Sequence, residues 1–294
     1  MSRRRPAAKA ASQLRNASDL DEVRARYADA IMVWARQAGI AKERVQHAFA
    51  TVARDRFLTP PPWRIFSPGG GLDTETSDAA DLYADVLIVL DRPKGINNGQ
   101  PSLHAAWLSG VDPQPGESVV QIGIGAGYYT AILAELVGES GRIDGFEIDA
   151  ILAEIARANL AGLPQVAVHA TTGVGAALPP ADVVYVSAGA SAPDPSWLRA
   201  LREGGRLVMP WQAARGYGTT LAIRRVSGQF SARLYGEVSF VGCIGADAET
   251  VRPRGIPKHP VAETRSVWFT AERSPDDTST AIYADLWFST EPVS

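Results

Sequence analysis

The stretch VVQIGIGAGYYTAILAEL, residues 119–136, runs from a short apolar segment through three closely spaced glycines into a periodic alanine and leucine pattern. The apolar segment predicts a buried strand, and the periodic pattern predicts a helix. Glycines between a strand and a helix permit a sharp turn and let a ligand approach the backbone closely. The helix that follows offers free N–H groups and the positive end of its dipole. The stretch therefore predicts a strand–loop–helix unit built to bind a ligand.

Strand and helix patterns continue to alternate after this unit. A strand and a helix are predicted within residues 142–162, and two strands within residues 165–188. A helix over residues 195–205 should lead into a strand at residues 206–211, and two β-rich stretches up to residue 245 predict an antiparallel edge. Such alternation predicts a doubly wound, mostly parallel Rossmann-like α/β sheet with helices on both faces.

Composition divides the chain into four predicted segments. A basic tail with no apolar core, which we expect to be disordered, precedes a helical extension, the α/β domain and a C-terminal β-rich extension with two apolar bursts. We expect the last segment to form a short hairpin that is appended to the sheet or covers the site. The predicted boundaries are residues 1–17, 18–75, 76–246 and 247–294.

The helical extension is expected to hold two helices. Ser18 is a candidate N-cap for a helix that reaches about Gln37, and a second helix covers residues 45–52. Residues 67–80 form a polar, glycine-rich stretch that predicts a loop, and residues 82–91 predict a strand or an extended segment. Residues 95–101 are a second predicted loop, followed by a short helix that ends at Gly110.

Composition also argues against several classes of protein. The formal net charge of −3 does not suit a nucleic-acid binder, which usually needs a strongly basic face. Cys243 is the single cysteine, so no internal disulfide forms, and the four histidines lie too far apart for metal-ligand spacing. No apolar run approaches the ~20 residues that span a bilayer. We expect a cytoplasmic protein with no metal, nucleic-acid or membrane partner; a transit peptide at the basic start is a minor alternative.

The glycine loop departs from a dinucleotide fingerprint. That fingerprint is G-x-G-x-x-G, whereas Gly123, Gly125 and Gly127 form G-x-G-x-G, and Tyr128 occupies the position of the last expected glycine. Glu147, about 20 residues further on at the end of the next predicted strand, is placed to accept hydrogen bonds from both ribose hydroxyls of an adenosine. The spacing suggests an adenosine without a pyrophosphate, as in S-adenosylmethionine. NAD, and a tight turn with no ligand, remain alternatives.

These phrases resemble the protein-L-isoaspartate O-methyltransferases, a family of class I S-adenosylmethionine-dependent methyltransferases. The first two strand–helix units carry the likeness most clearly, and it extends over roughly residues 40–246. The resemblance implies S-adenosyl-L-methionine as the cofactor and methyl transfer to a carboxylate of a damaged or modified protein or peptide. Aromatic residues in a first helical turn are more often packing residues than ligand contacts, which applies to Tyr128. The cofactor-binding residues that we predict are Gln121, Gly123, Gly125, Gly127, Tyr128, Glu147 and Thr172.

The chain departs from the family at three positions. The family's substrate loop reads Ser-Gln-Pro, with the serine contacting the substrate, but this chain has Gly99, Gln100 and Pro101. Gln121 replaces an acid before the glycines, and Thr172 stands where the family has an acid near the adenine. A carboxylate acceptor needs alignment and a dry site rather than a strong base, so the lost hydroxyl should slow the reaction or change the acceptor.

The acceptor loop is the predicted catalytic region. Asn97 and the residues around Gly99 are near enough in sequence to supply replacement hydrogen bonds. His104 is a candidate base for an alcohol or amide acceptor. The interpretation that we favour is a partly buried histidine that packs beside Trp107. The catalytic residues that we predict are Asn98, Gly99, Gln100, Pro101 and Ser102.

The acceptor itself is left open by the sequence. One alternative function is a methyltransferase of the same lineage that acts on a different peptide or on a small molecule. Another is a catalytically silent, cofactor-binding interaction protein whose extensions are docking surfaces. The predicted partners are accordingly a protein or peptide acceptor or a small-molecule acceptor.

Overall fold

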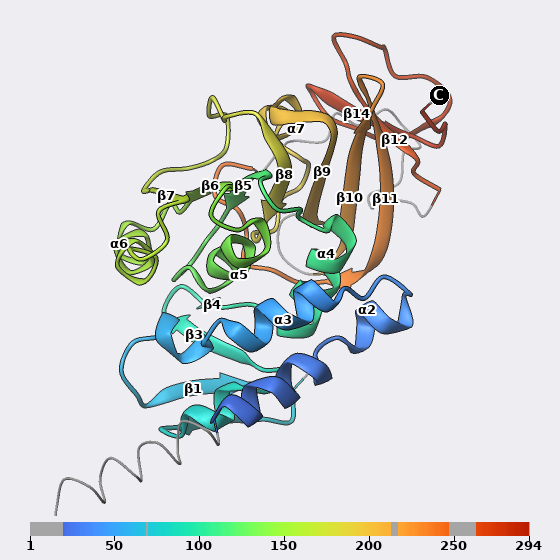
Figure 1. Ribbon diagram of the computed structural model, residues 1–294. Coiled ribbons are helices and arrows are strands. Elements are labelled where there is room, and N and C mark those ends of the chain that lie inside the picture. The colour runs from blue at the N-terminus through green and yellow to red at the C-terminus, as the bar shows by residue number, and fades with distance from the viewer. Residues whose placement is uncertain (1–19, 69, 213–216, 247–262, 294) are drawn as a thin grey trace, which may run out of the picture. The chain divides into compact units, whose positions relative to one another are not determined.

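The computed structural model describes residues 20–68, 70–212, 217–246 and 263–293 (Figure 1). The chain divides into two compact units, Met1–Asp112 and Pro113–Ser294. The predicted tail, residues 1–17, and the first part of the predicted C-terminal extension, residues 247–262, lie outside the described residues. Among the described residues, no helix combines the length and the apolar character needed to cross a membrane.

The first predicted helix of the first unit is broken in two. Residues 20–30 are helical, and a turn at residues 31–32 separates them from α2, so the single helix predicted to reach Gln37 is interrupted. Lys42, in an extended conformation, precedes α3, whose Val45, Ala48 and Phe49 are buried at helical spacing. The helical elements of this unit are α2 (Val33–Gln37), α3 (Glu43–Thr51), the 3₁₀ turns η1 (Arg54–Phe57) and η2 (Ala79–Leu82), and α4 (Pro101–Val111).

The first unit also contains an antiparallel sheet with the strand order β2-β1-β3-β4. The predicted helical extension, residues 18–75, included a loop from residue 67 but no strands, whereas β1 and β2 form a hairpin in which Phe66 pairs with Asp73. β2 is polar and exposed, so hydrophobic alternation gave no signal for it. The strand predicted over residues 82–91 begins only at Leu87. The strands are β1 (Trp63–Phe66), β2 (Asp73–Thr76), β3 (Leu87–Asp91) and β4 (Ile96–Asn97).

The second unit is built on one ten-stranded sheet with the order β13-β14-β12-β11-β10-β9-β8-β5-β6-β7. In one part of the sheet, β9, β8, β5, β6 and β7 run parallel to their neighbours. In the other part, from β9 through β10, β11, β12 and β14 to β13, neighbouring strands are antiparallel. The predicted antiparallel edge is thus confirmed. The strands are β5 (Ser118–Ile122), β6 (Arg142–Phe146), β7 (Val166–His169), β8 (Ala181–Val186), β9 (Leu201–Trp211), β10 (Gly218–Val226), β11 (Gln229–Val238), β12 (Ser266–Phe269), β13 (Ser279–Ile282) and β14 (Leu286–Ser289).

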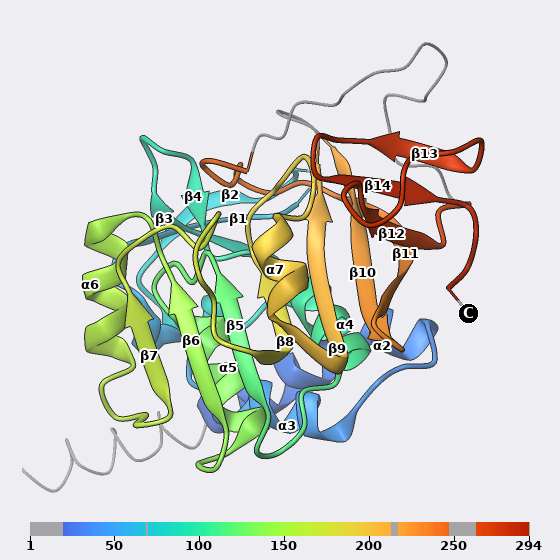
Figure 2. The same ribbon diagram turned by 90° about the horizontal axis from the view of Figure 1, so that it is seen from above.

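Three helices cover the parallel half of this sheet. α5 (Tyr128–Val137) and α6 (Ala150–Asn159) lie on one face, and α7 (Pro195–Ala200) lies on the other (Figures 1 and 2). This arrangement confirms the doubly wound α/β fold. The helix predicted over residues 195–205 is wrong in its second half, because the chain becomes extended at Leu201, which pairs with Ala181 at the start of β8.

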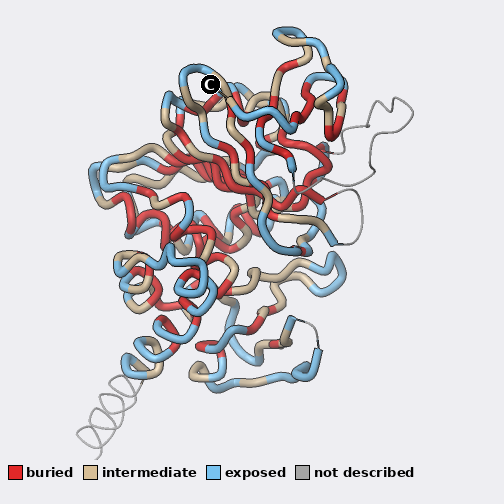
Figure 3. The backbone as a smooth tube through the Cα atoms, turned by 90° about the vertical axis from the view of Figure 1, so that its right-hand side faces the viewer, coloured by how far each residue is buried: buried red, intermediate tan, exposed pale blue. Residues whose placement is uncertain are grey.

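The core of the second unit follows the strands of the sheet (Figure 3). Val120 and Val184 point to the face where Trp197 of α7 packs, in a single cluster that extends to Trp211 and Phe288. Phe288 belongs to β14, so the last strands of the chain share the core of the sheet. Strand order reverses at β5, with β6 on one side and β8 on the other, which makes the carboxyl end of β5 the topological switch point where open α/β sheets bind ligands.

Candidate active site

The three predicted glycines form the turn at this switch point. Gly123, Gly125 and Gly127 have φ values of 75°, 55° and 95°, in the left-handed region that side chains disfavour. The amide of Gly123 donates to the carbonyl of Phe146 at the end of β6, 2.9 Å away. A Cβ on Gly127 would lie 2.8 Å from the side chain of Leu160. The loop therefore keeps its path because its glycines have no side chains.

Glu147 is joined directly to this loop. It follows β6, is 7% exposed, and one carboxylate oxygen accepts the amide of Gly125 at 2.7 Å while the other accepts the amide of Asp149 at 3.0 Å. Burial raises the pKa of Glu147, against the opposing effect of these amides. Each carboxylate oxygen has a further lone pair, so the group can still accept two hydroxyl donors. This contact places the predicted acid directly beside the predicted glycine loop.

Gln121 lies buried in the strand before the glycines. It is 1% exposed and sits between Gly145 of β6 and Tyr185 of β8. Among the described residues, its Oε1 atom has no hydrogen-bond partner. A buried acceptor without a partner costs about 1–3 kcal/mol, so a donor from a bound ligand would be favourable there. The orphaned acceptor and the carboxylate of Glu147 both fit an adenosine-bearing cofactor with a polar tail.

The other predicted cofactor residues lie around the same edge. Tyr128 is buried at the start of α5, where its ring packs against Tyr129 at a centroid distance of 5.0 Å. Thr172 follows β7, and its hydroxyl accepts the amide of Val174 at 3.1 Å. Thr172 is therefore engaged in a local turn that orders the chain after β7.

Two residues beside the glycine loop escaped the sequence analysis. Asn159, on α6, donates from its side-chain amide to the carbonyl of Ala126 at 2.9 Å and so ties the loop to the second helix. Ile148 directly follows Glu147 and is 47% exposed, an apolar side chain presented next to the acid. Ile148 could have been proposed from the sequence, because it directly follows the acid at the end of a predicted strand. The contact of Asn159 depends on the packing of α6 and has no such sequence pattern.

The acceptor loop, residues 97–102, belongs to the first unit and is held by hydrogen bonds to side chains of that unit. Asn97 Oδ1 accepts the amide of Gly99 at 2.9 Å, and Gly99 has a φ of 76°. Asp85 accepts the amide of Ser102 at 2.8 Å, its hydroxyl at 2.6 Å and the side-chain amide of Gln100 at 2.9 Å. Pro101 occupies the first turn of α4, where its missing N–H costs nothing. Asp85 was not singled out in the sequence, although it organises most of the loop.

Arg54 fixes the same loop from η1. It is 0% exposed, and its guanidinium donates to the carbonyls of Leu82 and Val86 at 2.7 Å each and to Asn98 Oδ1 at 3.2 Å. Asn98 Oδ1 also accepts the amide of Ile88 at 2.9 Å. A rigid, multidentate donor suits this site, because a guanidinium presents several N–H groups in one plane.

His104 is packed inside the first unit. It is buried on α4 with its ring 5.8 Å from that of Trp107. Burial and the charge of Arg54 lower the pKa of His104 to about 3. A histidine with so low a pKa is a poor general base near neutral pH, which favours the packing role over the catalytic one.

The burial of His104 predicts a specific loss of stability in acid. An unfolded histidine has a pKa near 6.5, so between that pH and about 3 the unfolded chain binds more protons than the native chain. The free energy of unfolding should therefore fall on acidification below about pH 6.5, by up to about 1.4 kcal/mol per pH unit from this group. Urea unfolding of His104→Gln should show a shallower fall than wild type. The exposed His47, replaced in the same way, is the control, and equal slopes in all three proteins would contradict the prediction.

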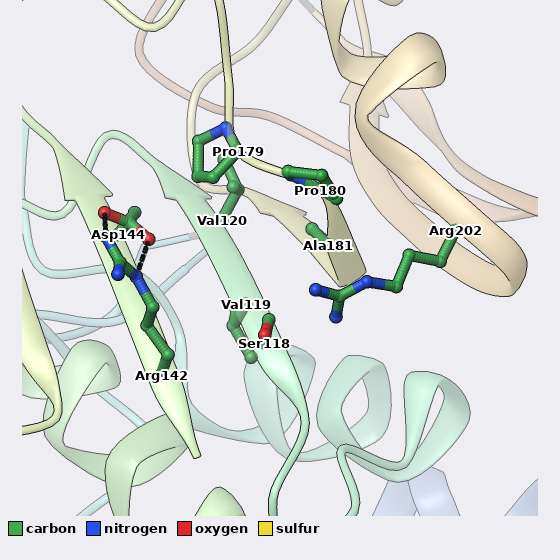
Figure 4. A pocket seen from close by; sticks show the side chains of 9 residues that line it. All are labelled: Ser118, Val119, Val120, Arg142, Asp144, Pro179, Pro180, Ala181 and Arg202. Atoms are coloured by element: carbon green, nitrogen blue, oxygen red, sulfur yellow. Dashed lines mark hydrogen bonds and ion pairs between the residues drawn. The ribbon is translucent and has the colours of Figure 1, made fainter.

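A pocket of about 250 Å³ lies at the opposite end of the strands (Figure 4). Its walls include the first residues of β5, β6 and β8, together with Pro179 and Pro180. Two arginines line the pocket: Arg142 forms a salt bridge with Asp144, and Arg202 forms one with Asp182. The guanidinium groups of the pocket are therefore already paired with carboxylates. Because ligands of open α/β sheets bind at the carboxyl ends of strands, this pocket is distinct from the candidate active site.

The glycine loop, its buried acid and the doubly wound sheet define the class of Rossmann-like, S-adenosylmethionine-dependent methyltransferases. A solved protein-L-isoaspartate O-methyltransferase shares the fold, with a TM-score of 0.61 at 23% identity over 74% of this chain and 66% of that one. A Plasmodium falciparum structure described as a member of that family, in complex with S-adenosyl-L-homocysteine, has a TM-score of 0.57 at 17% identity over 73% of this chain and 96% of that one.

The sequence model of the Protein-L-isoaspartate(D-aspartate) O-methyltransferase family matches residues 77–248, and the chain belongs to this family. It is 38% identical to the protein-L-isoaspartate O-methyltransferase of Methylorubrum populi over 55% of this chain and 76% of that protein. It is 33% identical to the enzyme of the same name from Aeropyrum pernix over 79% of this chain and 83% of that protein. The family resemblance predicted from the sequence is confirmed.

Proposed function

We propose that this protein is an S-adenosylmethionine-dependent O-methyltransferase that methylates a carboxylate on a damaged or modified protein or peptide. The observation that carries the proposal is the hydrogen bond that the Gly125 amide donates to Glu147, which holds a ribose-binding acid against the glycine turn at the switch point of the sheet. Family membership favours S-adenosylmethionine over NAD. We further propose a cytoplasmic location, in keeping with the net charge and the single cysteine.

The residues of the second unit have distinct roles in cofactor binding. Glu147 accepts the ribose hydroxyls, and Ile148 offers an apolar surface to the adenine ring. Gln121, whose Oε1 atom has no hydrogen-bond partner among the described residues, accepts a donor from the polar methionine portion. When bound, the cofactor supplies an electrophilic methyl group on a sulfonium. The protein contributes alignment and the exclusion of water, since a carboxylate acceptor is already nucleophilic at neutral pH.

The loop of residues 97–102 is proposed to position the acceptor. Its side chains are committed to one another, to Asp85 and to Arg54, so the loop presents a fixed backbone and the surface at Gly99. A glycine at this position favours a second candidate function, methyl transfer to a different peptide or small-molecule acceptor. Turnover of an isoaspartyl peptide by the unmodified protein supports the first function. Binding of S-adenosylhomocysteine without such turnover supports the second.

Replacing Gly99 tests whether the loop has diverged. Because φ is 76°, any side chain there is strained by roughly 1–2 kcal/mol, so Gly99→Ser changes both the backbone and the chemistry. Gly99→Ala carries the same strain without the hydroxyl and is the matched control. We expect Gly99→Ser to exceed Gly99→Ala in isoaspartyl-peptide turnover by about fivefold, the effect of one hydrogen bond, while both bind S-adenosylhomocysteine as wild type does. Equal turnover by the two variants would show that a serine hydroxyl has no role here.

A further inference from the structure

A short segment after β8, residues 187–191, forms one wall of the glycine loop. The amide of Ser187 donates to the carbonyl of Ile122 at 2.8 Å. A Cβ built on Gly123 would lie 3.5 Å from the Cβ of Ala188, so the two backbones run in close contact. Movement of this segment would therefore reach the glycine turn directly.

The far side of the segment is anchored to the end of β9 and to residues 240–246. Ala190 donates to the carbonyl of Pro210 at 3.1 Å, and Gly189 donates to that of Val241 at 2.8 Å. The amide and the hydroxyl of Ser191 both donate to the carbonyl of Ala246, at 3.3 and 3.0 Å. These bonds fix the backbone of the segment but leave the carbonyl of Ser191 to be held from elsewhere.

Trp211 holds that carbonyl, and the C-terminal strands hold Trp211. The indole N–H of Trp211 donates to the carbonyl of Ser191 at 2.7 Å and is shared with the hydroxyl of Tyr283 at 3.0 Å. The Trp211 ring stacks on Phe288 of β14 at a centroid distance of 4.2 Å. Tyr283 is 7% exposed, and burial raises its pKa to about 12, so its hydroxyl stays neutral at physiological pH.

We propose that Trp211 is a positioning residue for cofactor binding: seated against Tyr283 and Phe288 of the C-terminal extension, it braces the wall of the glycine loop through the carbonyl of Ser191. This role rests on the proposed function of that loop. It also assigns a role to residues 263–293, all of which lie beyond the matched family region, residues 77–248. The extension thereby acts on the site from within the same sheet.

The test uses the full chain carrying Trp211→Phe, which keeps an aromatic ring beside Phe288 and removes the donor to Ser191. We expect the dissociation constant of S-adenosylhomocysteine, measured by calorimetry, to rise about threefold to tenfold. Hydrogen exchange without ligand should be faster at the amides of residues 189–191. Tyr283→Phe removes one acceptor of the same indole N–H and leaves its bond to Ser191, so it should change both measurements less. Tyr235→Phe, at an exposed position on β11, is the control and should match wild type.

A lower melting temperature in Trp211→Phe with unchanged ligand affinity and unchanged exchange at residues 189–191 would overturn the proposal, because Trp211 would then only stabilise the fold. Failure of the wild-type protein to bind S-adenosylhomocysteine would instead overturn the proposed function. In that case the exchange measurement still decides whether Trp211 braces the segment.

Discussion

Replacing Glu147 with alanine is expected to weaken S-adenosylhomocysteine binding about 100-fold, or about 2.7 kcal/mol. Two charge-assisted hydrogen bonds to the ribose would be lost. The amide of Gly125, which donates to this carboxylate at 2.7 Å, would also lose its partner, so the glycine turn itself would relax. Calorimetric titration of both proteins with S-adenosylhomocysteine measures the effect.

Three controls separate this role from a general loss of structure. Glu147→Gln keeps the shape but only one accepting oxygen, so its affinity should fall between those of wild type and the alanine variant. Glu154→Ala changes an exposed acid on α6 and should bind normally. Wild-type affinity should also decline on acidification, starting above the usual glutamate range because burial raises the pKa of Glu147. Unchanged affinity in Glu147→Ala would remove this residue from the cofactor site.

Arg54→Gln is expected to destabilise the first unit by about 3 kcal/mol. The substitution strands the buried carbonyls of Leu82 and Val86 and removes one of the donors to Asn98, since a glutamine amide is too short to reach all three. Urea unfolding measures the stability, and hydrogen exchange over residues 82–98 shows whether the loss is local. We also expect a higher KM for an isoaspartyl peptide, because the acceptor loop loses its anchor.

The matched control is Arg56→Gln in the same 3₁₀ turn. Arg56 is exposed, so its removal should change stability by less than about 0.5 kcal/mol. Comparable losses in the two variants would contradict the prediction, because the buried hydrogen bonds of Arg54 would then contribute no more than the exposed charge of Arg56. A large loss of stability in Arg54→Gln with normal S-adenosylhomocysteine affinity would show that Arg54 stabilises the first unit without contributing to cofactor binding.

The C-terminal strands bear on the alternative of a docking extension. β12 pairs with β11 and β14 pairs with β12, and Trp287 and Phe288 of β14 are buried, so much of this segment is interior rather than free surface. The sequence predicted a hairpin that is appended to the sheet or covers the site, and in the structure β12 pairs with β11 of the sheet. The contacts of this segment with Trp211 could not be foreseen, because they join residues about 70 positions apart.

The sequence by itself determined the glycine turn, its acid and the family. A left-handed turn depends on the absence of Cβ atoms at Gly123, Gly125 and Gly127, and the acid is placed by the length of one strand–helix unit. Both are local properties that residue spacing records. Only the tertiary structure revealed the supports: Asp85 and Arg54 at the acceptor loop, Asn159 behind the glycines, and Tyr283 beneath Trp211. Their hydrogen bonds depend on which distant segments pack together, and a buried polar side chain chooses its partner from whatever the fold brings within about 3 Å.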